Sequence, residues 1–337
     1  MKSGNLAFFV PHLGCPYHCS FCDQTCITGN RRMVSADEVI RTAREQAQGP
    51  ENRAAHTEIA FFGGSFTGID REYMEMLLST AYEYVSKGLF KGIRISTRPD
   101  YINQEILDIL KKYGVTSIEL GAQSMDDEVL EANKRGHTAQ QVVEASALIK
   151  ENSFALGLQM MTGLYKSDDK KDIYTAQELA LLQPDTIRIY PTIVLMYTDL
   201  AVLYLHSEYI PQSLEQAVDL CSDLLNFFDN MNIRVIRLGL HDSPSLKSKY
   251  LAGPYHPAFR ELCESKRFVK RFLGTVSDIK DSDSQKSYIV EVNPCDISKA
   301  VGQKRSNLEY LSGLGYNIHF IQNPQIKTGD MKIKPVK

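Results

Sequence analysis

Residues 6–23 read LAFFVPHLGCPYHCSFCD, an apolar run followed by three closely spaced cysteines. The run at 6–10 has the length and the composition of a buried β-strand. Cys15, Cys19 and Cys22 follow it with the spacing C-x3-C-x2-C. A structural zinc site takes four ligands and a disulfide framework takes an even number of cysteines. Three thiols in one loop therefore indicate another kind of site.

Cys26 extends this run to C-x3-C-x2-C-x3-C, which leaves a four-cysteine zinc or ferredoxin-like site as an alternative. In compact ferredoxin runs the fourth cysteine serves a second cluster, and the remaining cysteines of this chain are scattered. Cys15, Cys19 and Cys22 can hold three irons of a [4Fe–4S] cube. The fourth iron then keeps a position open for a chelating ligand, as a catalytic zinc does.

Short apolar runs alternate with longer amphipathic stretches along most of the chain. The apolar runs predict strands at 6–10, 57–62, 92–97, 116–120, 155–161 and 186–191. Helices are predicted near 35–48, 70–86, 103–113, 138–151, 169–182 and 213–230. Six βα units in series predict a parallel sheet, either an open doubly wound sheet or a (β/α) barrel. In both architectures the ligand site lies at the carboxyl ends of the strands, where the cysteine loop begins.

The alternation of strands and helices stops near residue 240, which sets the expected domain boundaries. Residues 1–240 form the predicted barrel, and 241–286 form a connecting loop and helix. Residues 287–337 read as a small α+β region with a strand, two short helices and a second strand. Residues 260–337 carry 14 Lys and Arg against 9 Asp and Glu, which is compatible with a polyanionic partner or with an ordinary solvated surface.

The 337 residues contain no apolar run near 18 residues, so no transmembrane helix and no membrane partner are expected. The amino-terminal stretch lacks the apolar core and cleavage site of a signal peptide. A cytoplasmic location is expected.

The cysteine loop resembles the signature of the radical S-adenosylmethionine (SAM) superfamily, in which an aromatic residue, here Phe21, precedes the third cysteine. The resemblance implies a partial (β/α)6 barrel with a small carboxyl-terminal extension. It also implies a [4Fe–4S] cluster whose open iron binds SAM, and reductive cleavage of SAM to a 5′-deoxyadenosyl radical. Such an enzyme needs an electron donor such as ferredoxin or flavodoxin.

The stretch FFGGSFTG at 61–68 resembles the GGE-type motif of the same superfamily, which implies that Gly63, Gly64 and Ser65 contact SAM. Further polar residues follow the predicted strands and would reach the barrel mouth. These additional SAM-binding candidates are Ser96, Arg98, Gln123 and Gln159. Arg98 could instead pair with Asp100, and Gln123 could cap a helix. Tyr190 is either a substrate-side residue or a packing residue, and no catalytic residue is assigned.

Several stretches resemble the catalytic subunit of Elongator, a tRNA-modifying radical SAM enzyme. They are STRPDY at 96–101 and the segments 119–138, 187–204 and 252–265. The segment 119–138 also resembles coproporphyrinogen dehydrogenase. The resemblance implies RNA, most specifically tRNA, as the substrate. The sequence shows no acetyltransferase domain, so the complete Elongator reaction is not expected.

Residues 292–320 resemble a KH-like RNA-binding module, in which a GXXG turn between two helices meets the nucleic-acid backbone. The turn here runs from Gly302 to Arg305, with arginine in place of the second glycine, and Lys304 and Arg305 could contact phosphates. A cap that packs on the barrel is the alternative. Two other functions stay open: a radical SAM enzyme for a porphyrinogen-like or other small molecule, and an RNA-binding protein with a structural metal.

Overall fold

The computed structural model describes residues 4–10, 18–23, 33–48, 54–277 and 286–336. The chain divides into two compact units. Met1–Ser213 and Met231–Tyr255 form the first, called the barrel unit here, and Leu214–Asn230 and His256–Lys337 form the second, called the tail unit. No helix in the described part of the chain combines the length and the apolarity needed to cross a membrane.

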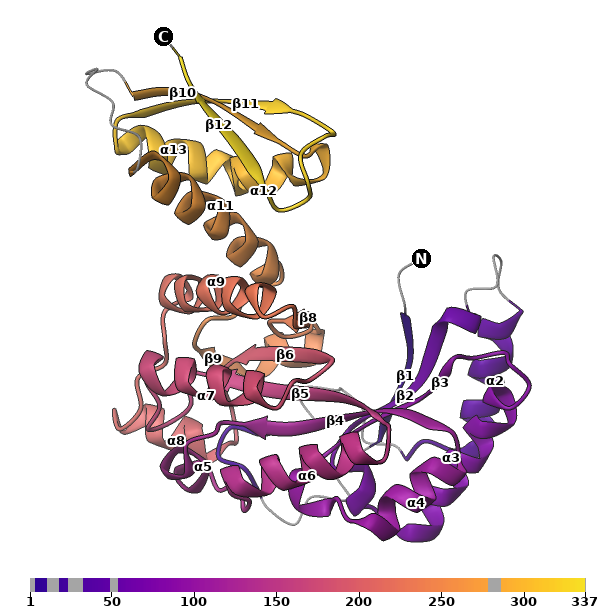
Figure 1. Cartoon of the computed structure of the whole chain (residues 1–337). Coiled ribbons are helices and arrows are strands. Elements are labelled where there is room, and N and C mark those ends of the chain that lie inside the picture. Colours follow the sequence, from indigo (N-terminus) through magenta and orange to yellow (C-terminus); the bar gives the residue numbers. More distant parts are fainter. Residues whose placement is uncertain (1–3, 11–17, 24–32, 49–53, 278–285, 337) are drawn as a thin grey trace. The chain divides into compact units, whose positions relative to one another are not determined.

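The barrel unit is built on one parallel sheet of seven strands, whose order follows the chain (Figure 1). The strands are β1 (Gly4–Val10), β2 (Thr57–Gly63), β3 (Gly92–Thr97), β4 (Val115–Gln123), β5 (Ala155–Thr162), β6 (Thr186–Pro191) and β8 (Arg234–Leu238). The predicted partial barrel and its first six strands are confirmed, and β8 adds a seventh strand at the edge. A two-stranded sheet of β7 (Val194–Leu195) and β9 (Tyr250–Ala252) lies in the same unit.

Helices connect the strands of the barrel unit. They are α2 (Ala36–Ala47), α3 (Arg71–Val85), α4 (Gln104–Lys112), α5 (Asp127–Ala132), α6 (Ala139–Glu151), α7 (Asp169–Leu181), α8 (Asp199–Leu205) and α10 (Pro244–Lys249). Their first turns carry the caps expected from the sequence: Ser35, Asp70 and Asn103 each accept a hydrogen bond from a backbone N–H three residues on. Short 3₁₀ turns follow β2 (Phe66–Gly68) and β3 (Pro99–Tyr101).

The two faces of the seven-stranded sheet differ in polarity because successive side chains of a strand point to opposite faces. One face is apolar and buried, with Ile59, Phe61, Ile95, Ile118, Leu158 and Ile189 all at most 1% exposed. The other, called the inner face here, carries polar and charged side chains. They are Glu58, Arg94, Ser96, Glu119, Gln159 and Arg188.

The tail unit has its own core. Its helices are α9 (Leu214–Asn230), α11 (Phe259–Ser277), α12 (Ile297–Val301) and α13 (Ser306–Gly313), and its strands are β10 (Lys286–Val292), β11 (Tyr316–Gln322) and β12 (Met331–Pro335). The sheet order is β11-β10-β12, with β11 parallel and β12 antiparallel to β10. Phe268, Phe272, Tyr288 and Val290 belong to one buried apolar cluster between α11 and this sheet.

The two units divide the chain at residues other than the expected boundaries at 240 and 286. Helix α9 was expected in the barrel domain, but it belongs to the tail unit and pairs with α11. Lys270 on α11 lies 2.8 Å from Asp223 on α9, and Arg267 lies 2.5 Å from Asp229. Residues 241–255, expected in the connecting segment, belong to the barrel unit.

Candidate active site

The described part of the cysteine loop is residues 18–23, which includes Cys19 and Cys22; Cys15 and Cys26 lie outside the described residues. Cys19 is 8% exposed, and the backbone N–H of Cys22 donates to the Cys19 carbonyl at 3.0 Å. A tight turn therefore brings two of the predicted ligands together. Within the described residues no group of three metal-ligating side chains forms, since the third predicted cysteine is not among them.

Residues between the two cysteines are anchored to distant parts of the barrel unit. Ser20 donates from its backbone N–H to the Asn133 carbonyl at 3.1 Å and from its hydroxyl to Asn133 Oδ1 at 2.8 Å. The Ser20 carbonyl accepts from the Leu200 N–H at 2.7 Å. Phe21 packs against the buried cluster that contains Val194 and Leu200. These contacts fix the loop position from the helices that follow β4 and β7.

Asp23, directly after Cys22, forms an ion pair with Lys249 at 2.7 Å. Their side chains are 15% and 24% exposed, respectively, so the pair is largely shielded from solvent. Lys249 ends α10, and its carbonyl accepts from the Met196 N–H at 2.8 Å. The sequence indicated only a connecting loop and helix at 241–286, so it did not predict this contact with the cysteine loop.

Arg135 is in direct contact with a cysteine of the loop. Its Nη1 donates to Cys19 Sγ at 3.2 Å and its Nη2 donates to the Gly121 carbonyl at 2.5 Å. Arg135 is 6% exposed. No role for Arg135 follows from the sequence, because its partners lie far away in the chain. The contact places a buried positive charge beside the Cys19 sulfur.

Arg98, a predicted SAM contact, pairs with Asp100 through two hydrogen bonds of 2.9 and 3.1 Å. Its Nη2 also donates to the Arg135 carbonyl. Arg98 therefore holds the backbone of the arginine that contacts Cys19. The ion pair with Asp100 is the alternative that the sequence left open for this residue.

The glycines after β2 let two chain segments approach closely. Gly63 has φ +118°, and a Cβ placed there would lie 2.2 Å from the Val10 carbonyl oxygen. The Gly64 N–H donates to the same oxygen at 3.2 Å. Ser65 is 2% exposed and its hydroxyl lies 2.8 Å from Thr97 Oγ1. The turn thus lies against the end of β1, where the cysteine loop begins.

The other predicted SAM contacts fall into two places. Gln123, at the end of β4, is close to Arg135: a Cβ on Gly121 would lie 3.0 Å from Gln123 Nε2 and 3.5 Å from Arg135 Nη2. The Gln123 Oε1 atom is buried and accepts no hydrogen bond from the described residues. Gln159 and Ser96 lie together on the inner face, where Gln159 Nε2 donates to Ser96 Oγ at 3.1 Å.

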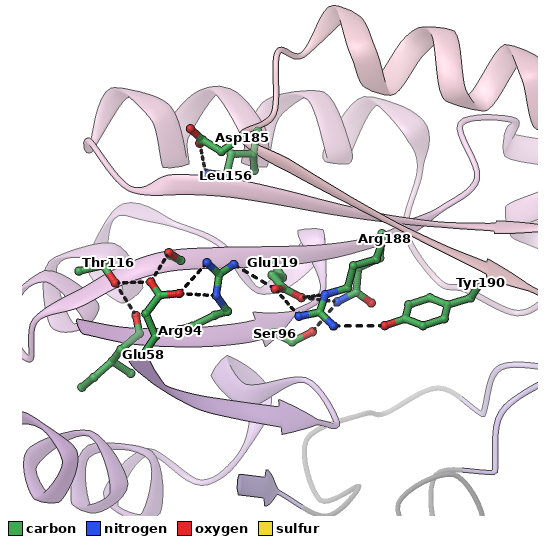
Figure 2. A network of polar contacts seen from close by, with 12 residues as sticks. Glu58, Arg94, Ser96, Thr116, Glu119, Leu156, Asp185, Arg188 and Tyr190 are labelled. Atoms are coloured by element: carbon green, nitrogen blue, oxygen red, sulfur yellow. Dashed lines mark hydrogen bonds and ion pairs between the residues drawn. The ribbon is translucent and has the colours of Figure 1, made fainter. Parts of the chain in front are cut away.

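A chain of buried charges runs across the inner face, as Figure 2 shows. Arg94 lies 2.7 Å from Glu58 and 3.0 Å from Glu119, and Arg188 lies 2.6 Å from Glu119. Burial opposes ionisation of Glu58, but the Arg94 guanidinium and hydrogen bonds from neighbouring hydroxyls outweigh it and lower the pKa. Glu119 also raises the pKa of Arg188 against the effect of burial. Tyr190 lies at the Arg188 end of this row of charged side chains, with its hydroxyl 3.5 Å from Arg188 Nη1.

These groups fit an iron–sulfur cluster and a polar ligand next to it. Cys19 and Cys22 supply two thiols within one turn, and Arg135 supplies an N–H donor to sulfur, which is the kind of contact that tunes such clusters. The buried Gln123 Oε1 offers an acceptor to a donor group of the ligand.

The candidate RNA-binding turn lies in the tail unit and has a constrained backbone. Gly302 has φ +81°, and a Cβ there would lie 2.6 Å from Ser306 Oγ. Lys304 and Arg305 are exposed and have φ of 50° and 68°. The Asn307 side chain donates to the Ala300 carbonyl at 3.0 Å and to other acceptors, which joins α12 to α13. The turn therefore exposes the cationic side chains of Lys304 and Arg305 between two helices that are hydrogen-bonded to each other.

Comparisons with known proteins agree with this geometry. A model of the radical SAM superfamily matches residues 9–177, and a model of the radical SAM C-terminal domain matches residues 184–268. The tRNA uridine(34) acetyltransferase of Methanocaldococcus jannaschii is 28% identical over 212 residues, which are 56% of this chain and 39% of that protein. Elongator complex protein 3 of Saccharomyces cerevisiae is 32% identical over 188 residues, which are 50% of this chain and 34% of that protein.

A solved structure has the same fold. The archaeal Methanocaldococcus infernus Elp3 with an N-terminal deletion matches with a TM-score of 0.63 at 20% identity, over 82% of this chain and 64% of that one. The chain spans about two fifths or less of the lengths of these two curated relatives. The superfamily model covers half of the chain, including the cysteine loop and the glycine turn. The chain belongs to the radical SAM superfamily.

Proposed function

We propose that the protein is a tRNA-modifying enzyme. As a radical SAM protein it is an enzyme that uses a [4Fe–4S] cluster and SAM. When bound, these groups together supply a carbon-centred radical that abstracts a hydrogen atom from the substrate. We propose tRNA as the substrate because this chain is similar to tRNA uridine(34) acetyltransferase and to Elongator complex protein 3.

Cys15, Cys19 and Cys22 are the proposed cluster ligands, and Cys26 is not a ligand in this proposal. Three features support the described part of this set: the turn between Cys19 and Cys22, the N–H donated by Arg135, and the anchoring of the intervening residues. The residues of the chain hold the loop in place before a cluster binds. A reductant such as ferredoxin or flavodoxin is the proposed electron donor.

SAM binding is proposed for the turn at Gly63–Ser65 and for Gln123, with Ser96 and Gln159 farther along the inner face. Gly63 has φ +118°, a backbone conformation that residues with a Cβ rarely adopt, and Gln123 has a buried acceptor without a hydrogen-bond partner among the described residues. Arg98 acts indirectly in this proposal, since it holds the Arg135 carbonyl.

RNA binding is proposed for the turn at Gly302–Arg305. Lys304 and Arg305 are exposed on a turn whose two flanking helices are joined by hydrogen bonds of Asn307. This turn suits contacts to phosphates, because a backbone that is already ordered loses little conformational entropy on binding. The double variant Lys304→Ala with Arg305→Ala should weaken tRNA binding and leave SAM cleavage without tRNA unchanged. Lys332→Ala, a variant of an exposed lysine elsewhere in the tail unit, is the matched control.

The proposal is tested by incubating anaerobically prepared protein with dithionite and SAM and measuring the 5′-deoxyadenosine formed. We expect 5′-deoxyadenosine to form, and we expect unmodified tRNA to increase its yield. Cys19→Ala should abolish the product, whereas Cys295→Ala, at an exposed cysteine in the tail unit, should not. Product formation that tRNA does not alter would count against tRNA as the substrate, and zinc bound to all four loop cysteines would contradict the radical chemistry.

A further inference from the structure

Two arginines lie side by side at the edge of the inner face. Arg188 on β6 and Arg237 on β8 are Cα partners in adjacent parallel strands, and paired residues of adjacent strands point to the same face. Strand β8 is the edge strand of the seven-stranded sheet, at the opposite edge from β1 and the cysteine loop. The two guanidiniums therefore belong to the part of the inner face that is farthest, in strand order, from the cysteines.

A β-bulge puts Arg237 in this position. The pairing of β6 with β8 shifts by one residue between Ile187 and Arg188, so that Ile236 has no partner on β6. Before the shift Val235 pairs with Ile187 on the apolar face, and after it Leu238 pairs with Ile189 on the same face. Without the bulge, the alternation would place Arg237 opposite Ile189 on the apolar face. Bulges that redirect a side chain are common beside functional sites.

On the described strands, the inner face carries more arginines than carboxylates. On the described strands, Glu119 accepts from both Arg94 and Arg188, and Glu58 accepts from Arg94. Arg237, whose Nε donates to the Gly239 carbonyl at 2.9 Å, is a third guanidinium on the same face, where the described strands carry two carboxylates. Burial, together with the nearby Arg237 and Arg188, lowers the pKa of His241, just after β8.

Arg188 is held in one orientation. Its Nε and Nη2 atoms contact the two oxygens of Glu119 at 2.6 and 2.7 Å, and its guanidinium lies 4.9 Å from the centre of the Phe62 ring. The remaining terminal nitrogen, Nη1, is on the side of the Tyr190 hydroxyl, 3.5 Å away. Figure 2 shows the tyrosine ring extending from this nitrogen along the inner face. An N–H donor and an O–H donor therefore meet on β6, whose neighbour β8 carries Arg237 as the Cα partner of Arg188.

We propose that Arg188, Arg237 and Tyr190 form a subsite for a phosphate group of the nucleotide substrate. A phosphate suits this geometry because it accepts several charge-assisted hydrogen bonds at once and offsets the excess positive charge. The subsite rests on the proposed function, since RNA supplies the phosphate. It also assigns a role to Tyr190, which the sequence left between substrate binding and packing.

The test uses Arg237→Gln, with Arg237→Lys as a charge-preserving variant. Arg234→Gln is the matched control, because Arg234 is an exposed arginine of the same strand at its other end. Binding of uridine 5′-monophosphate and of uridine is measured by ligand-observed NMR, and SAM binding is measured in parallel. Binding of a tRNA transcript is measured at several salt concentrations.

We expect Arg237→Gln to weaken binding of the monophosphate about 10- to 100-fold, the effect of losing a charge-assisted hydrogen bond. Binding of uridine and of SAM to Arg237→Gln should not change. Arg237→Lys should retain part of the preference for the phosphate. Arg234→Gln should behave as the unaltered protein does. For tRNA, the slope of log K against log salt should fall by about 0.7, the value for one phosphate contact on a single strand.

The subsite is refuted if Arg237→Gln binds the monophosphate as the unaltered protein does, if it loses uridine binding equally, or if it loses SAM binding instead. Binding of the monophosphate tests the subsite independently of whether tRNA is the substrate. An Arg237-dependent preference for the phosphate, with no binding of tRNA, would support the subsite and overturn the RNA substrate.

Discussion

Replacement of Glu119 by glutamine removes the carboxylate at the centre of the buried charge chain while keeping the size of the side chain. Glu119 is 1% exposed and contacts Arg94 at 3.0 Å and Arg188 at 2.6 Å. After the change Arg94 still has Glu58, at 2.7 Å. Arg188, whose side chain is 13% exposed, loses the carboxylate that orients it.

The expected loss of stability is about 3 kcal/mol, the low end of the range for a buried ion pair that loses one partner. The low end applies because Arg94 keeps its second carboxylate and because the glutamine oxygen still accepts one hydrogen bond. The control is Glu105→Gln, whose pair with Arg71 at 3.1 Å is 73% and 43% exposed, respectively. That change should alter stability by at most about 0.5 kcal/mol, as is usual for exposed pairs.

Urea unfolding gives the change in the free energy of unfolding, and hydrogen exchange of amides in β3–β6 assigns it to the barrel unit. If Arg188 forms the phosphate subsite, Glu119→Gln should also reduce the preference for uridine 5′-monophosphate over uridine. A change in stability below about 1 kcal/mol, no larger than that of an exposed pair, would refute the reasoning, since it would show that the two arginines do not depend on Glu119.

Three further predictions concern the candidate active site. Gly63→Ala should destabilise the protein by more than about 1–3 kcal/mol, because it adds a Cβ 2.2 Å from a carbonyl oxygen at φ +118°, whereas Gly313→Ala, with no atom within 4 Å, should be neutral; urea unfolding compares them. Lys249→Met should weaken cluster retention by about 1 kcal/mol, measured as faster iron release to a chelator, while Lys247→Met, in an exposed pair, should not. Burial and two arginines lower the pKa of His137 from 6.5 to about 3. At pH values between these two, His137 is therefore neutral in the folded protein and charged in the unfolded protein. Stability should therefore fall by about 1.4 kcal/mol per unit as the pH drops through this window, and His137→Asn should remove that slope; an unchanged slope would contradict it.

The strands and helices of the barrel were predictable because each forms from a local pattern. The pattern failed at β8, where RVIRL is short and carries two arginines, one of which a bulge turns to the inner face. It also failed at β12, MKIKP, where alternating lysines resemble a solvated tail. Short apolar runs indicate strands in a sequence, and edge strands that carry charged residues lack such runs.

The candidate site shows the same division between local and distant contacts. The pairing of Arg98 with Asp100 spans two residues and was one of the alternatives taken from the sequence. Contacts of Arg135 with Cys19 and of Lys249 with Asp23 span 116 and 226 residues, respectively. Only the folding of the whole barrel unit brings these residues together, so no spacing rule could identify them.

The most direct test of the central claim compares modified nucleosides in tRNA from cells with and without the gene. Mass spectrometry of digested tRNA measures every modified nucleoside at once. The account predicts that one modified nucleoside disappears without the gene, returns when the unaltered gene is restored, and does not return with the Cys19→Ala gene. An identical nucleoside profile in all four strains would contradict tRNA modification.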